Sequence, residues 1–158
     1  MALQKGVNSY VTVDEANTYF ADRLDVAAWT GASEEQKPQA LVTATKMLDD
    51  LDWTGYVVSE SQPLAFPRSG DYFDPRTGTT VSLSSSVPMR VQNATMELAY
   101  HLLNNDGLLD DTGTVESISI GGINITNIRQ ANKLPGVVER LVKPLLVNAG
   151  SNMWWRAN

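Results

Sequence analysis

Two aromatic-rich segments in the middle of the chain constrain its fold most. Residues 53–56 read Trp-Thr-Gly-Tyr, and residues 64–70 read Leu-Ala-Phe-Pro-Arg-Ser-Gly. Neither segment has the periodicity of a helix or a strand. We therefore expect a structural motif in which side chains hold the backbone and pack it onto the helices. Its residues are Trp53, Gly55, Leu64, Phe66, Pro67 and Arg68.

Residues 53–86, which contain both segments, are rich in proline, glycine and serine. These residue types interrupt helices and strands, so we predict a long irregular loop. A loop of this length inside a compact domain is uncommon and is typically functional.

The composition predicts one globular domain that spans residues 1–158. The chain is 42% hydrophobic and 19% charged, which is typical of a folded protein. Its apolar runs are too short to cross a membrane, and we see no signal peptide at the start. The chain has no cysteine, which excludes disulfides and thiolate metal sites.

Apolar spacing and capping patterns predict the first two helices. Thr12 and Glu15 form a capping box before a helix over residues 13–24. Ser33 and Gln36 offer a second capping box, before a helix that should end near Asp52. In the link between these helices, we expect Trp29 to fill the gap between them.

Two prolines open the later helices. Pro88 is a good first residue for a helix that continues to about Asn105, with a wide apolar face. Pro135 opens a final helix, and Pro144 should kink or end it.

Residues 114–128 have the pattern of a β-hairpin around Gly121-Gly122. In that register Ile120 pairs with Ile123 and Ile118 with Ile125, so that the four isoleucines share one face. A lone hairpin with an apolar face needs cover. We expect it to project from the body and to contact a neighbouring subunit. The predicted fold is therefore mainly α: a small bundle of about four helices, with the long loop and one hairpin.

Catalytic chemistry has no evident basis in the sequence, and we expect no catalytic residue, metal site or cofactor. The single histidine, His101, lies among leucines and cannot build a histidine metal site. Asp49, Asp50 and Asp52 diverge in direction on a helix, so we interpret them as a solvated helix end. An enzyme with an unrecognised site remains a minor alternative.

Charge is distributed unevenly over the chain, whose net charge is −6. The last thirty residues are basic, and the chain ends in an aromatic segment, so we expect residues 148–158 to be a docking tail for an acidic partner. The alternatives are a solvated helix face with a frayed end, a tail folded back on its own domain, or a segment that stacks on single-stranded bases. The candidate partner-binding residues are Arg129, Arg140, Lys143, Met153, Trp154, Trp155 and Arg156.

An ordered series of motifs runs along most of the chain. It begins with Ser9-Tyr-Val-Thr-Val-Asp-Glu-Ala16 and Trp29, continues with Trp53-Thr-Gly55 before Leu64-Ala-Phe-Pro-Arg68, and ends with Val87-Pro88, Glu97-Leu-Ala99 and Leu134-Pro135. This series resembles the tailed-bacteriophage head–tail adaptor (connector) proteins, a family often labelled DnaT-like single-stranded-DNA-binding protein.

The resemblance implies a structural virion protein in the neck, between capsid and tail, assembled in the host cytoplasm. Its copies would form a ring, of twelve subunits by the resemblance, with the portal protein on one side and a tail or second neck protein on the other. DNA would pass through an acidic lumen without tight binding, because like charges repel. The alternative, suggested by the family label, is a single-stranded-DNA-binding replication or primosome factor. The acidic balance argues against it, since affinity for phosphates comes from clustered lysine and arginine.

Overall fold

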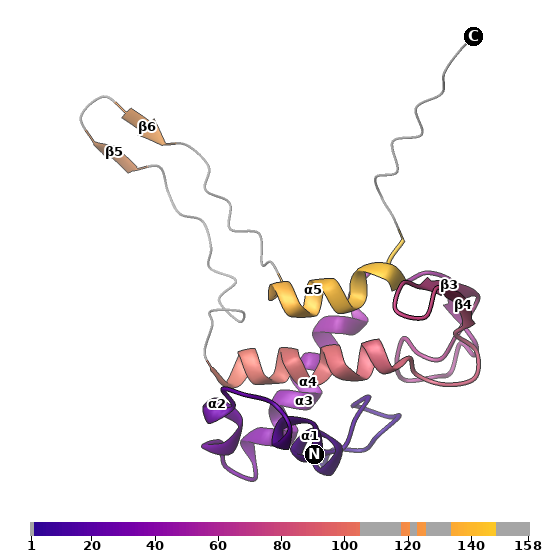
Figure 1. Ribbon diagram of the computed structural model, residues 1–158, viewed down its shortest axis with the longest axis horizontal. Helices are drawn as coiled ribbons and strands as arrows, with labels where there is room; N and C mark the ends of the chain where they lie inside the picture. Colours follow the sequence, from indigo (N-terminus) through magenta and orange to yellow (C-terminus); the bar gives the residue numbers. More distant parts are fainter. Residues whose placement is uncertain (1, 105–117, 121–122, 126–133, 148–158) are drawn as a thin grey trace.

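The computed structural model describes residues 2–104, 118–120, 123–125 and 134–147. Residues 2–104 and 134–147 form a helical body with short β-ribbons at one end (Figure 1). The helices of the described residues are α1 (Val13–Ala21), α2 (Ala27–Thr30), α3 (Gln36–Asp49), α4 (Met89–Leu103) and α5 (Gly136–Val142), which runs into the 3₁₀-helix η1 (Lys143–Leu145).

Helix α4 is the centre of the body, because it packs against both α3 and α5. In Figure 1, α5 lies on one side of α4, and α1 and α2 lie on the other. The fully buried residues of α4 include Val91 and Leu98, which meet a core that also contains Leu41 and Leu48 of α3 and Val138 of α5. The wide apolar face predicted for the helix after Pro88 is thus a face that the fold buries.

The prediction of a mainly α bundle with one long loop is wrong. Residues 53–86 contain four short strands: β1 (Tyr56–Val57), β2 (Arg68–Ser69), β3 (Asp71–Asp74) and β4 (Thr79–Ser82). They form two antiparallel two-stranded ribbons, β1 with β2 and β3 with β4. With five α-helices in the described residues, the fold is a mixed α and β arrangement.

The residues of β3 alternate between exposed and buried positions. Asp71 and Phe73 are exposed whereas Tyr72 and Asp74 are buried, which is the alternation of a half-buried strand. A turn then connects it to β4, where the amides of Thr77 and Gly78 donate to the carbonyl oxygen of Asp74. The prolines and glycines that predicted a loop therefore lie beside and between very short strands.

The hairpin of residues 114–128 is described only in its strands, β5 (Ile118–Ile120) and β6 (Ile123–Ile125). Their register pairs Ile118 with Ile125 and Ile120 with Ile123, which confirms the predicted pairing. The projection of the hairpin and its contact with a neighbouring subunit remain predictions.

Two helix ends differ from the prediction, and one of them is that of α3, which ends at Asp49 instead of near Asp52. Helix α1 ends at Ala21 instead of residue 24, and Leu24 is 91% exposed. The link to α3 contains the short helix α2, in which Trp29 is 2% exposed and donates from Nε1 to Oδ1 of Asn17 at 2.9 Å. Trp29 therefore fills the gap between helices as predicted, although it does so from a helix.

The capping and proline signals are confirmed. Thr12 accepts from the amide of Glu15, whose carboxylate accepts from the amide of Thr12. Ser33 and Gln36 make the same reciprocal pair, but α3 begins only at Gln36, and its cap residue Glu35 makes no side-chain cap hydrogen bond. Helix α5 ends at Val142, directly before the 3₁₀ turn that holds Pro144.

Candidate functional site

Arg68 holds the two aromatic-rich segments together through backbone carbonyl groups. Its Nε donates to the oxygen of Thr54 at 2.9 Å, and Nη1 donates to that of Ala65 at 3.2 Å. Its Nη2 donates to the oxygens of Trp53 at 3.3 Å and of Gly55 at 2.6 Å. A guanidinium has five donors in a fixed plane, so one side chain can fix four carbonyls that no regular ladder satisfies.

Gly55 permits the closest approach in this motif. Its φ is +76°, and a Cβ built on it would lie 1.9 Å from the carbonyl oxygen of Ser69. Ser69 is the residue with which Tyr56 pairs in the β1–β2 ribbon. The ribbon can therefore close only with glycine at position 55.

Phe66 and Trp53 are the apolar centre of the motif. Phe66 is 4% exposed, and its ring packs edge-on against Trp53 at 4.9 Å and Tyr10 at 6.0 Å between centroids. The Trp53 indole donates to the carbonyl oxygen of Leu48 at 2.8 Å, at the end of α3. Leu64 is buried beside them, and the peptide bond before Pro67 is cis.

Tyr10 closes this centre with a buried polar contact. Its hydroxyl donates to the carboxylate of Asp49, which also accepts from the amide of Ala65 at 3.3 Å. Burial and the adjacent carboxylate raise the pKa of Tyr10, and burial raises the pKa of Asp49. The contacts of all the motif residues are thus internal, which suits a role in holding the fold.

A groove of about 770 Å³ lies between the β3–β4 ribbon and the start of α4. At its base Asp74 is 5% exposed and accepts from Arg90 Nη2 at 3.1 Å and from the amide of Arg76 at 2.9 Å. The amide of Arg76, followed by the charge-assisted bonds of Arg90, lowers the pKa of Asp74. Sequence analysis missed this cluster, although the alternation of residues 71–74 is a signal for it.

We expect Asp74 to make stability depend on pH. Its folded-state pKa lies below its ordinary value, so its contribution is present above about pH 4 and is lost as pH falls through the folded-state pKa. Asp74→Asn should lower the melting temperature at pH 7 and flatten its decline between about pH 5 and pH 2. Thermal melts by circular dichroism over that range measure this effect.

The control is Asp71→Asn, which changes an exposed carboxylate on the same strand. We expect its melting temperatures to follow those of the unchanged protein. If the Asp74→Asn curve runs parallel to the control, the ion pair with Arg90 does not hold the ribbon on α4.

A second buried charge joins α1 to α4. The Tyr19 hydroxyl donates to Oε1 of Glu97 at 2.7 Å, and Arg23 Nη2 lies 3.0 Å from Oε2. The Arg23 guanidinium also lies over the Tyr100 ring, 4.4 Å from its centroid. The Glu97 side chain is 4% exposed, and its Oε2 has the Arg23 charge nearby but no hydrogen bond, so the Tyr19 bond and the ion pair with Arg23 join the two helices.

A family model described as "Putative DnaT-like ssDNA binding protein" matches residues 2–157 of this chain. The chain belongs to this family. No curated protein and no solved structure matches it. The family description names single-stranded DNA and no virion role, so it supports the alternative function predicted above and not the adaptor.

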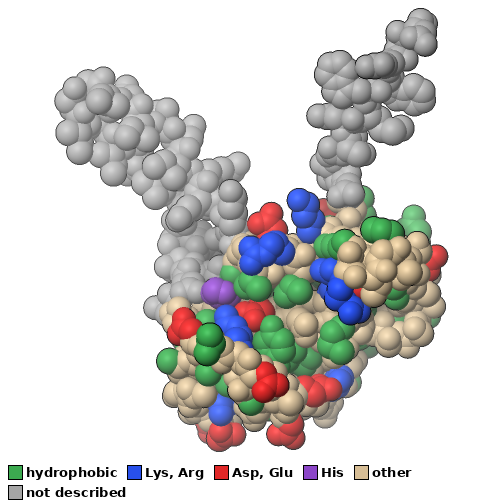
Figure 2. Space-filling model, in the orientation of Figure 1, with side chains coloured by type: hydrophobic (Ala, Val, Ile, Leu, Met, Phe, Trp, Pro, Cys, Tyr) green, Lys and Arg blue, Asp and Glu red, His purple; other side chains and the backbone are tan. Residues whose placement is uncertain are grey.

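In the described part of this DnaT-like protein, most cations already have partners. Five of the nine lysine and arginine side chains form ion pairs with acidic side chains, and Arg68 binds carbonyls. The ion-paired residues are Lys5, Arg23, Lys37, Arg76 and Arg90. On the face shown in Figure 2, several Lys and Arg side chains lie over α5 and beside the β3–β4 end, with an acidic side chain next to them, and the lower edge carries most of the visible Asp and Glu together with Lys or Arg.

The predicted partner-binding residues fall in two groups. Arg140 on α5 and Lys143 in η1 are exposed, and within the described residues neither forms an ion pair. The others lie outside the described residues: Arg129, Met153, Trp154, Trp155 and Arg156. The described residues also contain no group of three acidic or histidine side chains that could hold a metal ion. No helix in that part is long and apolar enough to span a membrane.

Proposed function

We propose that this DnaT-like protein is a structural head–tail adaptor of a tailed phage. Its copies form a ring under the portal protein in the neck of the virion, join the capsid to the tail and let DNA pass. The ring has about twelve copies, as the resemblance to head–tail adaptors implies. The observation that carries the proposal is the use of three arginines: Arg23, Arg68 and Arg90 make contacts inside the body, and the chain keeps a net charge of −6.

The body is acidic, and several of its arginines are used in internal contacts. These properties suit a channel through which DNA passes better than they suit a surface that binds DNA. Phosphate binding requires several lysine or arginine side chains that release counterions from the nucleic acid. In the described body, five lysine and arginine side chains form ion pairs and Arg68 binds backbone carbonyls. The remaining cations there are Lys46, Arg140 and Lys143. Like charge along a lumen lowers the local affinity for DNA and lets it slide.

A closed ring also requires two unlike surfaces on each subunit that meet head to tail. Figure 2 shows a partial separation of charge, with several cations over α5 and most of the visible carboxylates towards the lower edge, and such an imbalance can supply two unlike surfaces. We place the isoleucines of β5 and β6 at contacts with a neighbouring subunit. We place Arg140, Lys143 and the tail of residues 148–158 at contacts with the portal or a second neck protein.

Single-stranded-DNA binding is the second candidate, because the family description names it. Two exposed aromatic side chains could stack on bases: Tyr56 is 80% exposed and Phe73 is 60% exposed. Both lie on the short ribbons, where Arg76 also reaches solvent. The same region carries the carboxylates of Asp71 and Asp74, which oppose phosphate.

We expect no measurable binding of single-stranded DNA at physiological salt. The test is a fluorescence-anisotropy titration of a labelled thirty-nucleotide oligo-dT with the purified protein. The control repeats it at low salt, where a phosphate-driven affinity would rise steeply. Micromolar or tighter binding with a steep salt dependence would favour the second candidate and count against the adaptor.

A further inference from the structure

The groove beside β3 and β4 offers one cation that is open to solvent. The Arg90 side chain is 19% exposed and is held by Asp74, whereas that of Arg76 is 77% exposed and lies 3.9 Å from the same carboxylate. Two arginines share a single carboxylate, so this spot has an excess positive charge on an acidic protein. Arg76 can therefore pair with a further carboxylate.

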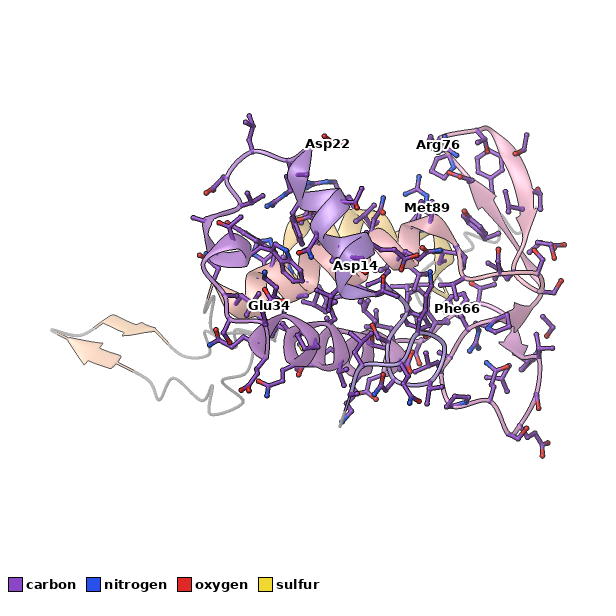
Figure 3. The ribbon with its side chains drawn as sticks, turned by 90° about the horizontal axis from the view of Figure 1, so that it is seen from below. Asp14, Asp22, Glu34, Phe66, Arg76 and Met89 are labelled. Atoms are coloured by element: carbon purple, nitrogen blue, oxygen red, sulfur yellow. The ribbon has the colours of Figure 1, made fainter. Side chains whose placement is uncertain are left out.

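Apolar side chains line the groove next to this cation. Met89, at the start of α4, is 66% exposed, Val81 of β4 is 37% exposed, and Leu141 reaches the groove from α5. Figure 3 shows Met89 and Arg76 close together on the same side of the molecule. A ligand that fits this chemistry combines apolar side chains with carboxylates.

The chain itself contains a segment with this chemistry. Residues 106–111 read Asp-Gly-Leu-Leu-Asp-Asp, two leucines between acidic residues, directly after the end of α4. The groove lies at the opposite end of the same helix. Helix α4 has 15 residues, so the two ends are about 22 Å apart. A contact between opposite ends of two copies is head-to-tail, the type that builds rings.

We propose that the groove between β3–β4 and α4 binds residues 106–111 of a neighbouring copy of this chain. The carboxylates of Asp110 and Asp111 pair with Arg76, and Leu108 and Leu109 cover Met89 and Leu141. This interface rests on the ring assembly proposed above and gives it a specific contact.

The test is the assembly of charge-reversed variants of the full chain, measured by sedimentation velocity over a range of concentrations. Arg76→Glu alone, and Asp110→Arg with Asp111→Arg, should each raise the concentration needed for assembly about tenfold. The three changes combined should restore assembly. Arg76→Gln should give a smaller loss, and Lys46→Glu, an exposed lysine on α3 outside the groove, should give none.

Circular dichroism confirms that each variant is folded. Unchanged assembly of both charge-reversed variants, or no recovery in the combination, would overturn this interface while leaving the ring intact. If the unchanged protein does not assemble without the portal, a labelled peptide of residues 104–113 tests the groove directly. That peptide should bind the unchanged protein about tenfold tighter than Arg76→Glu. Absence of this difference, or displacement of the peptide by oligo-dT, would overturn the proposal.

Discussion

Replacement of Gly55 with alanine is expected to destabilise the fold by about 3 kcal/mol or more. A Cβ at this position would lie 1.9 Å from the carbonyl oxygen of Ser69, and the residue has a φ of +76°. The backbone must move, which separates β1 from β2 and disturbs the carbonyl of Gly55 that Arg68 binds at 2.6 Å. Denaturant unfolding measures the loss.

Gly78→Ala is the matched control for this substitution. Gly78 has a similar φ of +69°, but a Cβ there would meet nothing within 4 Å. Gly78→Ala should therefore lower the free energy of unfolding only by the conformational strain of the positive φ, about 1–2 kcal/mol. Equal losses for the two variants would mean that the contact with Ser69 is not essential to the motif.

Phe66→Ala should destabilise the protein by about 3–5 kcal/mol, because it leaves a cavity at a site that is 4% exposed. The lost ring packs on Trp53 and Tyr10 and joins the ribbons to the end of α3. Phe73→Ala removes an identical side chain that is 60% exposed and should cost no more than about 0.5 kcal/mol. Thermal melts with similar midpoints for both variants would show that Phe66 does not anchor the motif.

Local signals in the sequence predicted the helical part well. The capping box at Thr12 and Glu15 involves residues three positions apart, and the pairing of Ile118 with Ile125 follows from the short turn between the strands. Such short-range contacts follow from sequence spacing alone. The burial of Trp29 was predicted from its size and place, although its helix was not.

The ribbons of residues 53–86 could not be predicted in the same way. They depend on Arg68, which binds carbonyls up to 15 residues away, and on the Asp74 to Arg90 pair, which spans 16 residues. The Tyr19 to Glu97 contact joins residues 78 positions apart. No periodicity marks such pairs, so the sequence of these strands of two to four residues predicts a loop.

The proposed function depends on which charged side chains reach the surface, and the amino-acid composition indicates this only in part. The sequence shows an acidic chain with a basic end, but it does not show that Arg23 and Arg90 are occupied by Glu97 and Asp74. That pairing removes cations from the surface and weakens the case for phosphate binding. The groove beside Asp74 likewise emerges only when the β3–β4 ribbon lies on α4.

The most direct test of the adaptor is negative-stain electron microscopy of the purified protein mixed with its cognate portal protein. We predict rings of this protein stacked coaxially on one face of the portal, with a central channel. Portal particles without added density, at protein concentrations well above those of the portal, would contradict the adaptor function.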